Sequence, residues 1–207
     1  MRLAFTQSKG LVVIMVVLTA ILVWAYPLLS LLPLALLAFI FYFFRDPRRR
    51  IKPAPGAVLA PADGRVTKIA RIDCDFVGPD AWEVSIFMSP LDVHVNRSPV
   101  QGMVKSVAHR AGKFLPAMNP NAPLCNEKRS YCLQGACRVK VVQIAGILAR
   151  RTVNWVEEGE KVEQGAKIGM IKFSSCTQTV FPGDFALTVK EGDKVRAGLS
   201  SLGEVRP

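Results

Sequence analysis

The sequence has only two histidines and five cysteines among its 207 residues, and neither residue type is arranged as a metal site. Cys132 and Cys137 are separated by four residues, and no histidine stands beside them to complete a zinc pattern. An odd number of cysteines without regular pairing also argues against a disulfide framework. We therefore predict free thiols, no metal site and a cytoplasmic location for the globular part.

Acidic residues are scarce, with 16 Asp and Glu against 27 Lys and Arg, so the formal net charge is +11. Residues 1–50 carry six basic residues and one acidic residue, on both sides of an apolar segment. Such flanks suit an anionic lipid surface, which attracts each nearby basic residue by ~1 kcal/mol. The basic residues are not interleaved with aromatics in a stripe, so we predict no nucleic-acid partner.

The N-terminal region lacks any charged residue from Leu11 to Phe44. This stretch is too long for the hydrophobic part of a cleaved signal peptide. A single membrane span needs ~20 apolar residues, so the stretch corresponds to one long tilted span or to two short ones hinged at Tyr26-Pro27. Basic residues at both ends favour a hairpin that returns to the cytoplasmic side. We predict that residues 1–50 form a transmembrane anchor of two short apolar helices in the cell membrane.

No sustained helical periodicity exists beyond Pro53, where short apolar runs alternate with Gly, Pro and Asp. This texture predicts a mainly β domain over residues 51–207. The runs expected to be strands are Val58–Leu59, Val66–Ile69, Trp82–Met88, Val93–Val95, Met103–Val107, Cys137–Ile144, Lys167–Phe173, Thr177–Phe181 and Ala186–Val189.

An internal repeat supports a β architecture. The segment from Val156 to Gly165 recurs from Val189 to Gly198 with the pattern Val-x-Glu-Gly-acidic-Lys-Val-x-x-Gly. Each copy predicts a hairpin turn with Gly at positive φ and Val pointing inward. The repeat resembles the turns of lipoyl-like barrel-sandwich hybrids, so we expect a barrel-sandwich-hybrid-like domain. The copies lack the exposed lysine at a hairpin tip that a carrier domain would modify.

Ser174 and Ser175 form a pair with a chemical use beyond turn formation. The hydroxyl of Ser175 can attack the carbonyl of Ser174 and convert the amide into an ester. β-Elimination then leaves a dehydroalanine that hydrolyses to a pyruvoyl group. Most serine pairs are ordinary turn residues, and Ser200-Ser201 is a second pair, so the pair alone leaves both interpretations open.

Several ordered motifs precede this pair. They are Phe44-Arg-Asp-Pro-Arg48, Leu59-Ala-Pro-Ala-Asp-Gly-Arg-Val66, Phe87-Met-Ser-Pro-Leu-Asp-Val-His-Val-Asn-Arg97, Ala111-Gly-Lys-Phe114, Asn126-Glu127, Gln143-Ile-Ala-Gly146 and Ala149-Arg-Arg151. Together, from about residue 40 to about residue 185, they resemble the short, membrane-anchored form of phosphatidylserine decarboxylase. That family usually has Phe-Gly-Ser at its cleavage turn, whereas this chain has Phe173-Ser174-Ser175. Serine resists strained turns that glycine accepts, at a cost of ~1 kcal/mol or more, so slower maturation is expected.

The resemblance implies a pyruvoyl-dependent carboxy-lyase that needs no pyridoxal phosphate. It would convert phosphatidylserine to phosphatidylethanolamine and CO2 through a Schiff base with a pyruvoyl group derived from Ser175. Self-cleavage would give a heterodimer of residues 1–174 and 175–207, and a homo-oligomer is left open. The catalytic domain would lie on the cytoplasmic side of the membrane. The alternatives are a membrane-anchored adaptor that is never processed and an inactive homologue.

The two histidines are the candidate acid-base groups. Residues two apart in a strand share a face, so the carboxylate of Asp92 and the imidazole of His94 are expected to project together. The carboxylate would fix the tautomer of the ring. The family resemblance implies an Asp-His-Ser arrangement with Asp92 and Ser175, but His109, close to the flexible Gly112, could also face the site. We expect one histidine to assist self-cleavage and the other to protonate the product.

Overall fold

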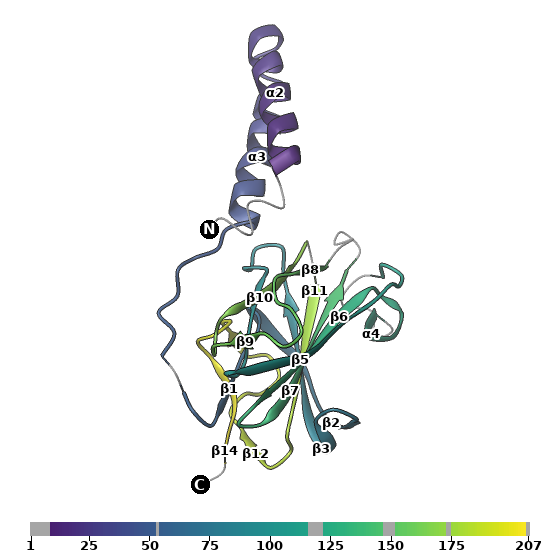
Figure 1. Cartoon of the computed structure of the whole chain (residues 1–207). Coiled ribbons are helices and arrows are strands. Elements are labelled where there is room, and N and C mark those ends of the chain that lie inside the picture. Colours follow the sequence, from purple (N-terminus) through teal and green to yellow (C-terminus); the bar gives the residue numbers. More distant parts are fainter. Residues whose placement is uncertain (1–8, 53, 116–121, 147–151, 173–174, 206–207) are drawn as a thin grey trace. The chain divides into compact units, whose positions relative to one another are not determined.

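The computed structural model describes residues 9–52, 54–115, 122–146, 152–172 and 175–205. The chain divides into two units, Met1–Arg48 and Arg49–Pro207. In the part of the chain that the structure describes, the first unit contains two helices and the second is almost entirely β (Figure 1). The predicted mainly β fold with two N-terminal helices is therefore confirmed.

The two N-terminal helices are α2 (Lys9–Ala25) and α3 (Leu31–Phe43). The helix α2 ends just before Tyr26-Pro27 because a residue that precedes proline is disfavoured in helical conformation. Pro33 is tolerated within the first turn of α3, where its missing N–H has no helical partner to lose. The prediction of two helices hinged at this point, rather than one long helix, is confirmed. Within the described residues, neither helix has both the length and the apolar character required to cross a membrane.

Within its described residues, the second unit contains fourteen strands and one short helix, α4 (Ala122–Cys125). The strands are β1 (Ala57–Leu59), β2 (Gly64–Cys74), β3 (Gly78–Met88), β4 (Val95–Arg97), β5 (Gly102–Arg110), β6 (Lys128–Gly135), β7 (Arg138–Ala145), β8 (Thr152–Asn154), β9 (Lys161–Val162), β10 (Lys167–Ile171), β11 (Ser175–Phe181), β12 (Phe185–Leu187), β13 (Lys194–Val195) and β14 (Ser201–Val205).

One large antiparallel sheet dominates this unit, with the strand order β13-β2-β3-β11-β7-β6-β5-β9. Two three-stranded sheets, β1-β14-β12 and β4-β10-β8, complete the domain. In Figure 1 the large sheet is curled, with β1, β14 and β12 toward one end of β11 and β8 and β10 toward the other. The strand β11 lies in the interior of the large sheet, so both of its edges are hydrogen-bonded.

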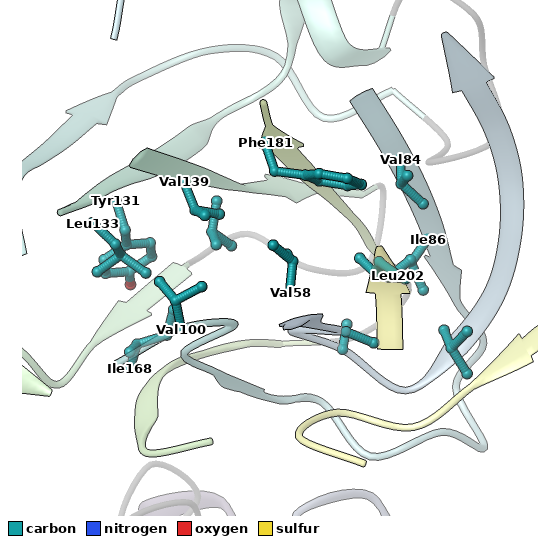
Figure 2. Packing of buried hydrophobic residues seen from close by; sticks show 14 of the residues in the cluster. Val58, Val84, Ile86, Val100, Tyr131, Leu133, Val139, Ile168, Phe181 and Leu202 are labelled. Carbon is teal, nitrogen blue, oxygen red and sulfur yellow. The ribbon is translucent and has the colours of Figure 1, made fainter. Parts of the chain in front are cut away.

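The hydrophobic core lies inside the curl, where the two small sheets pack against the large one. Figure 2 shows Val58 of β1 and Leu202 of β14 facing side chains of the large sheet such as Phe181 and Ile86. All four side chains are fully buried. Every residue of β11 is buried except the partly exposed Gln178, as is expected of a strand in the middle of a covered sheet. This packing fixes the register of β11 and hence the position of its first residue.

The two copies of the internal repeat form tight turns. Gly159 and Gly192 have φ values of +85° and +93°, as the pattern predicts. Equivalent 3.2 Å hydrogen bonds close the turns, from Glu160 N–H to Glu157 O and from Asp193 N–H to Lys190 O. The predicted hairpins are absent here, since the copies lead into β9 and β13, which pair with β5 and β2 at opposite edges of the large sheet.

Candidate active site

Ser175 is the first residue of β11 and is fully buried. It pairs with Met88 of β3 on one side and with Ala145 of β7 on the other. Backbone pairing on both edges holds its Cα rigidly. Phe173 and Ser174 lie outside the described residues, so cleavage between Ser174 and Ser175 remains a prediction.

The hydroxyl of Ser175 donates a hydrogen bond to the thioether of Met88, with Oγ and Sδ 3.5 Å apart. The hydroxyl of Thr177, two residues along the same face of β11, donates to the same sulfur atom at 3.4 Å. A thioether is a weak acceptor, so it holds the Ser175 hydroxyl without deactivating it through a charged partner. Sequence reasoning missed both Met88 and Thr177.

The neighbouring thiol of Cys176 points to the opposite face of the strand from Ser175, because successive side chains alternate. Burial, and secondarily the nearby Glu83, raises the pKa of Cys176 to about 12. The thiol is therefore protonated and a poor nucleophile at neutral pH. This leaves Ser175 as the side chain at the start of β11 that is suited to attack the chain.

His94 lies at the Ser175 end of β11. Its carbonyl accepts a hydrogen bond from Ile171 N–H at 3.2 Å, and Ile171 precedes Ser175 by four residues. Asn96, two residues after His94, donates to the Thr177 hydroxyl at 3.1 Å, which brings this segment against β11. The imidazole is fully buried, in surroundings from which bulk water is excluded.

The tautomer of His94 follows from its contact with Asp92. Nδ1 of the ring lies 3.0 Å from the backbone carbonyl oxygen of Asp92. A carbonyl only accepts, so Nδ1 must carry the proton and donate it. The neutral ring then has its lone pair on Nε2, the form required of a general base.

The structure gives the Asp92 carboxylate a different role from the expected one. Asp92 and His94 precede β4 and do not share the face of a strand. The carboxylate accepts a hydrogen bond from Ser89 N–H at 2.8 Å, and Asp92 N–H donates to Ser89 O at 2.9 Å. These contacts close a tight turn, a common use of a short acidic side chain. The turn presents the Asp92 carbonyl to the ring.

His109 occupies a different part of the sheet. It lies in β5, in a row of paired residues that runs from Thr177 through Gln143 and Arg129. Paired residues face the same side, so His109 is on the Ser175 side of the sheet, three strands away at about 4.8 Å per strand. Its side chain is 44% exposed, and Nε2 lies 3.2 Å from Oε1 of Glu127. The structure thus does not bring the two histidines into one buried cluster.

Asn126 and Glu127 support the strand beside Ser175. The amide of Asn126 donates to the carbonyls of Ala145 at 2.7 Å and Leu115 at 2.8 Å. The backbone carbonyl of Glu127 accepts from Ala145 N–H at 2.9 Å. Because Ala145 pairs with Ser175, this motif fixes the edge against which the reactive residue sits. In the sequence, this structural role was indicated only by the place of Asn126-Glu127 among the ordered motifs.

A cavity of about 860 Å³ lies at the opposite end of β11 from Ser175. Its walls include Pro182 and Phe185, which follow the last residue of the strand, together with Cys137. Burial, and secondarily Asp184, raises the pKa of Cys137 to about 11, so this thiol is also protonated at neutral pH. The cavity contains neither of the two histidines and is separate from the candidate site.

Comparison with known proteins gives a consistent result. The sequence profile of phosphatidylserine decarboxylase matches residues 36–203. The phosphatidylserine decarboxylase proenzyme of Symbiobacterium thermophilum is 41% identical over 199 residues, which are 95% of this chain and 91% of that protein. The proenzyme of Salinibacter ruber is 43% identical over 189 residues, covering 88% of this chain and 82% of the relative. The chain therefore belongs to the phosphatidylserine decarboxylase family, as its motifs indicated.

Proposed function

We propose that this protein is a self-processing, pyruvoyl-dependent phosphatidylserine decarboxylase. The observation that carries the proposal is the buried hydroxyl of Ser175 at the start of an interior strand, at the end of that strand where His94 lies. The match over most of the chain to named proenzymes supports the same activity. Family membership argues against the adaptor alternative. An inactive homologue would have the same fold as the active enzyme, so only a measurement of cleavage separates these two alternatives.

Self-cleavage begins when Nε2 of His94 takes the proton of the Ser175 hydroxyl. The Ser175 oxygen bonds to the carbonyl carbon of Ser174, the C–N bond breaks, and the nitrogen takes up a proton. Removal of the α-proton of residue 175 then expels the carboxylate of Ser174 and leaves a dehydroalanine. Its imine form adds water and releases ammonia, which leaves a pyruvoyl group on the smaller product. The surroundings of Ser175 fit this group, because its contacts are with uncharged side chains.

The pyruvoyl group would supply the electrophilic carbonyl that accepts the electrons released when CO2 departs. His109, three strands from Ser175, lies too far from the pyruvoyl position to protonate the product carbon directly, so it would act on the substrate side by contacting the headgroup. Its partial exposure allows it to meet a substrate that enters from solvent or lipid, and Glu127 orients its ring. The buried His94, whose tautomer is set by Asp92, would serve self-cleavage.

The two products, 1–174 and 175–207, would remain a heterodimer after cleavage. From the smaller product, β11 pairs with β3 and β7, β13 pairs with β2, and β14 pairs with β1. A largely buried ion pair adds to this: the two terminal guanidinium nitrogens of Arg49 donate to the Asp63 carboxylate, at 2.7 and 2.6 Å. Arg49 also donates to Ala197 O at 2.6 Å, while Asp63 accepts from Ala197 N–H at 2.8 Å.

The helical unit would embed in an anionic membrane, with the basic residues of segment 45–50 on the cytoplasmic side. Its apolar side chains point outward, and Trp24, Leu28 and Leu32 are 90%, 83% and 78% exposed. Exposed apolar area of this extent is unfavourable in water and favours burial in lipid. Trp24 and Tyr26 near the turn are residue types enriched at membrane interfaces. A lipid substrate would then reach the domain from the same membrane.

The activity is tested with purified full-length protein and phosphatidylserine vesicles. We expect release of CO2 and formation of phosphatidylethanolamine, both measured by mass spectrometry, with loss of both in Ser175→Ala. Treatment with phenylhydrazine, which reacts with carbonyls, should inhibit the enzyme without added pyridoxal phosphate. Absence of phosphatidylethanolamine from fully cleaved protein would contradict the proposed substrate. Deletion of residues 1–44 should preserve cleavage and reduce activity on vesicles.

A further inference from the structure

A chain of buried hydrogen bonds runs beneath Ser175. The Tyr131 hydroxyl donates to Oε1 of Gln143 at 3.1 Å. Nε2 of Gln143 donates to Oδ1 of Asn96 at 2.8 Å, and Nδ2 of Asn96 donates to the Thr177 hydroxyl at 3.1 Å. All four side chains are completely buried. Buried polar side chains are costly unless they are hydrogen-bonded, so such a connected chain is a specific feature of the fold.

The hydrogen bonds of this buried series all point the same way, from Tyr131 toward Thr177. Burial raises the pKa of Tyr131, so its hydroxyl remains a donor. Each amide accepts through its oxygen on one side and donates through its nitrogen on the other. The Thr177 oxygen accepts the hydrogen bond from Asn96, so the Thr177 hydroxyl points its own hydrogen at the sulfur of Met88. The series of hydrogen bonds that begins at Tyr131 thus ends at the Met88 sulfur, which also accepts the hydrogen bond from the Ser175 hydroxyl.

Met88 needs such a restraint. Methionine is unbranched and flexible, and its thioether forms only weak hydrogen bonds. A second donor on the sulfur limits the positions that it can take, and so limits the positions of the Ser175 hydroxyl that rests on it. Thr179 provides a contrast on the same face of β11, because its buried hydroxyl has no hydrogen-bond partner among the described residues.

We propose that Thr177 is a positioning residue for self-cleavage, which holds the Ser175 hydroxyl in place through the shared sulfur of Met88 and is itself oriented by Asn96. The inference rests on the proposed function, since it concerns the self-cleavage of that same serine. Thr177 takes no proton from Ser175 and forms no bond with the chain. Its contribution is to the fraction of molecules in which the Ser175 hydroxyl lies ready to attack.

The test compares self-cleavage rates of pulse-labelled full-length chains made by cell-free translation. Thr177→Val keeps nearly the same shape, and Asn96 retains the carbonyl of Pro61 at 3.3 Å as an acceptor, so the fold should persist. We expect cleavage about five- to ten-fold slower, the effect of losing one hydrogen bond. Thr177→Ser should restore the wild-type rate, and the matched control Thr179→Val should cleave at the wild-type rate. The pH dependence of cleavage in Thr177→Val should be unchanged, because the base is unaltered.

A double-mutant cycle distinguishes positioning from general destabilisation. If Thr177 acts through Met88, then Met88→Leu should slow cleavage similarly, and adding Thr177→Val to it should have little further effect. Equal rates for Thr177→Val and wild type would overturn the inference, as would equal slowing by Thr179→Val or fully additive effects with Met88→Leu. Failure of the wild-type chain to cleave would instead overturn the proposed function. Thermal unfolding of each uncleaved chain checks that it is folded.

Discussion

The surroundings of His94 and of His109 differ in almost every physical respect. His94 is fully buried, lies beside the strand that leads to Ser175, and donates through Nδ1 to a backbone carbonyl. His109 is 44% exposed, lies three strands from Ser175, and contacts the carboxylate of Glu127. A buried ring with a fixed tautomer suits a reaction of the chain with itself. An exposed ring paired with a carboxylate suits a reaction with a substrate that comes and goes.

The largest effect should come from His94→Gln. This variant removes the base at the Ser175 end of β11, and general-base assistance accounts for roughly 10²–10⁴-fold in rate. We expect the chain to remain uncut over hours, as judged by gel electrophoresis. Cleavage at the wild-type rate would show that the buried ring is structural and would remove the distinction between the two sites.

His109→Gln should show the opposite behaviour. Cleavage should proceed normally, because the ring is remote from Ser175, and the variant should contain the full amount of a carbonyl-reactive group. Decarboxylation should fall about ten-fold if the ring contacts the substrate headgroup, the effect of losing one hydrogen bond to a charged group. Slow cleavage with normal turnover per cleaved molecule would reverse the two assignments.

Asp92→Ala should have an intermediate effect. The backbone carbonyl that orients His94 remains in the variant, while the turn loses the hydrogen bond between the carboxylate and Ser89 N–H. Loss of about 1 kcal/mol in holding the turn corresponds to cleavage slowed by roughly five-fold. A complete block, measured in the same pulse-labelled assay, would mean that the carboxylate itself takes part in the proton transfer.

Ser174→Gly should have the smallest effect. Glycine accepts strained turns at lower energy, by ~1 kcal/mol, so cleavage should accelerate a few-fold and give the same products. A slower glycine variant, in the same assay, would indicate that the Ser174 hydroxyl contributes to the reaction.

Much of the fold could be predicted because apolar runs and turn residues carry local information. The strands that contain Ile86, Val141 and Phe181 were expected from their composition. The strand β6 was missed, since its sequence mixes charged and polar residues and only Tyr131 and Leu133 are fully buried within it. Its membership in the sheet depends on pairing with β5 and β7, which sequence patterns do not show.

The sequence proposed which residues carry the chemistry, which stays a prediction, but it could not show their contacts. Ser175 and His94 were proposed because family motifs accompany a serine pair and because the chain has only two histidines. The meeting of Ser175 with Met88 joins residues 87 positions apart, and that of Thr177 with Met88 joins residues 89 apart. Such contacts are set by sheet register. The expected placement of Asp92 and His94 on one strand face was wrong, because a turn precedes β4, while the part of the Asp92 carboxylate in self-cleavage stays a prediction.

The intact mass of the purified protein tests the central claim most directly. The account predicts two pieces, residues 1–174 and 175–207, with the smaller lighter by one ammonia than the product of simple hydrolysis, because its first residue has become a pyruvoyl group. Ser175→Ala should give one uncut chain. A single chain from the wild-type protein, or a smaller piece that begins with an unmodified serine, would contradict the account.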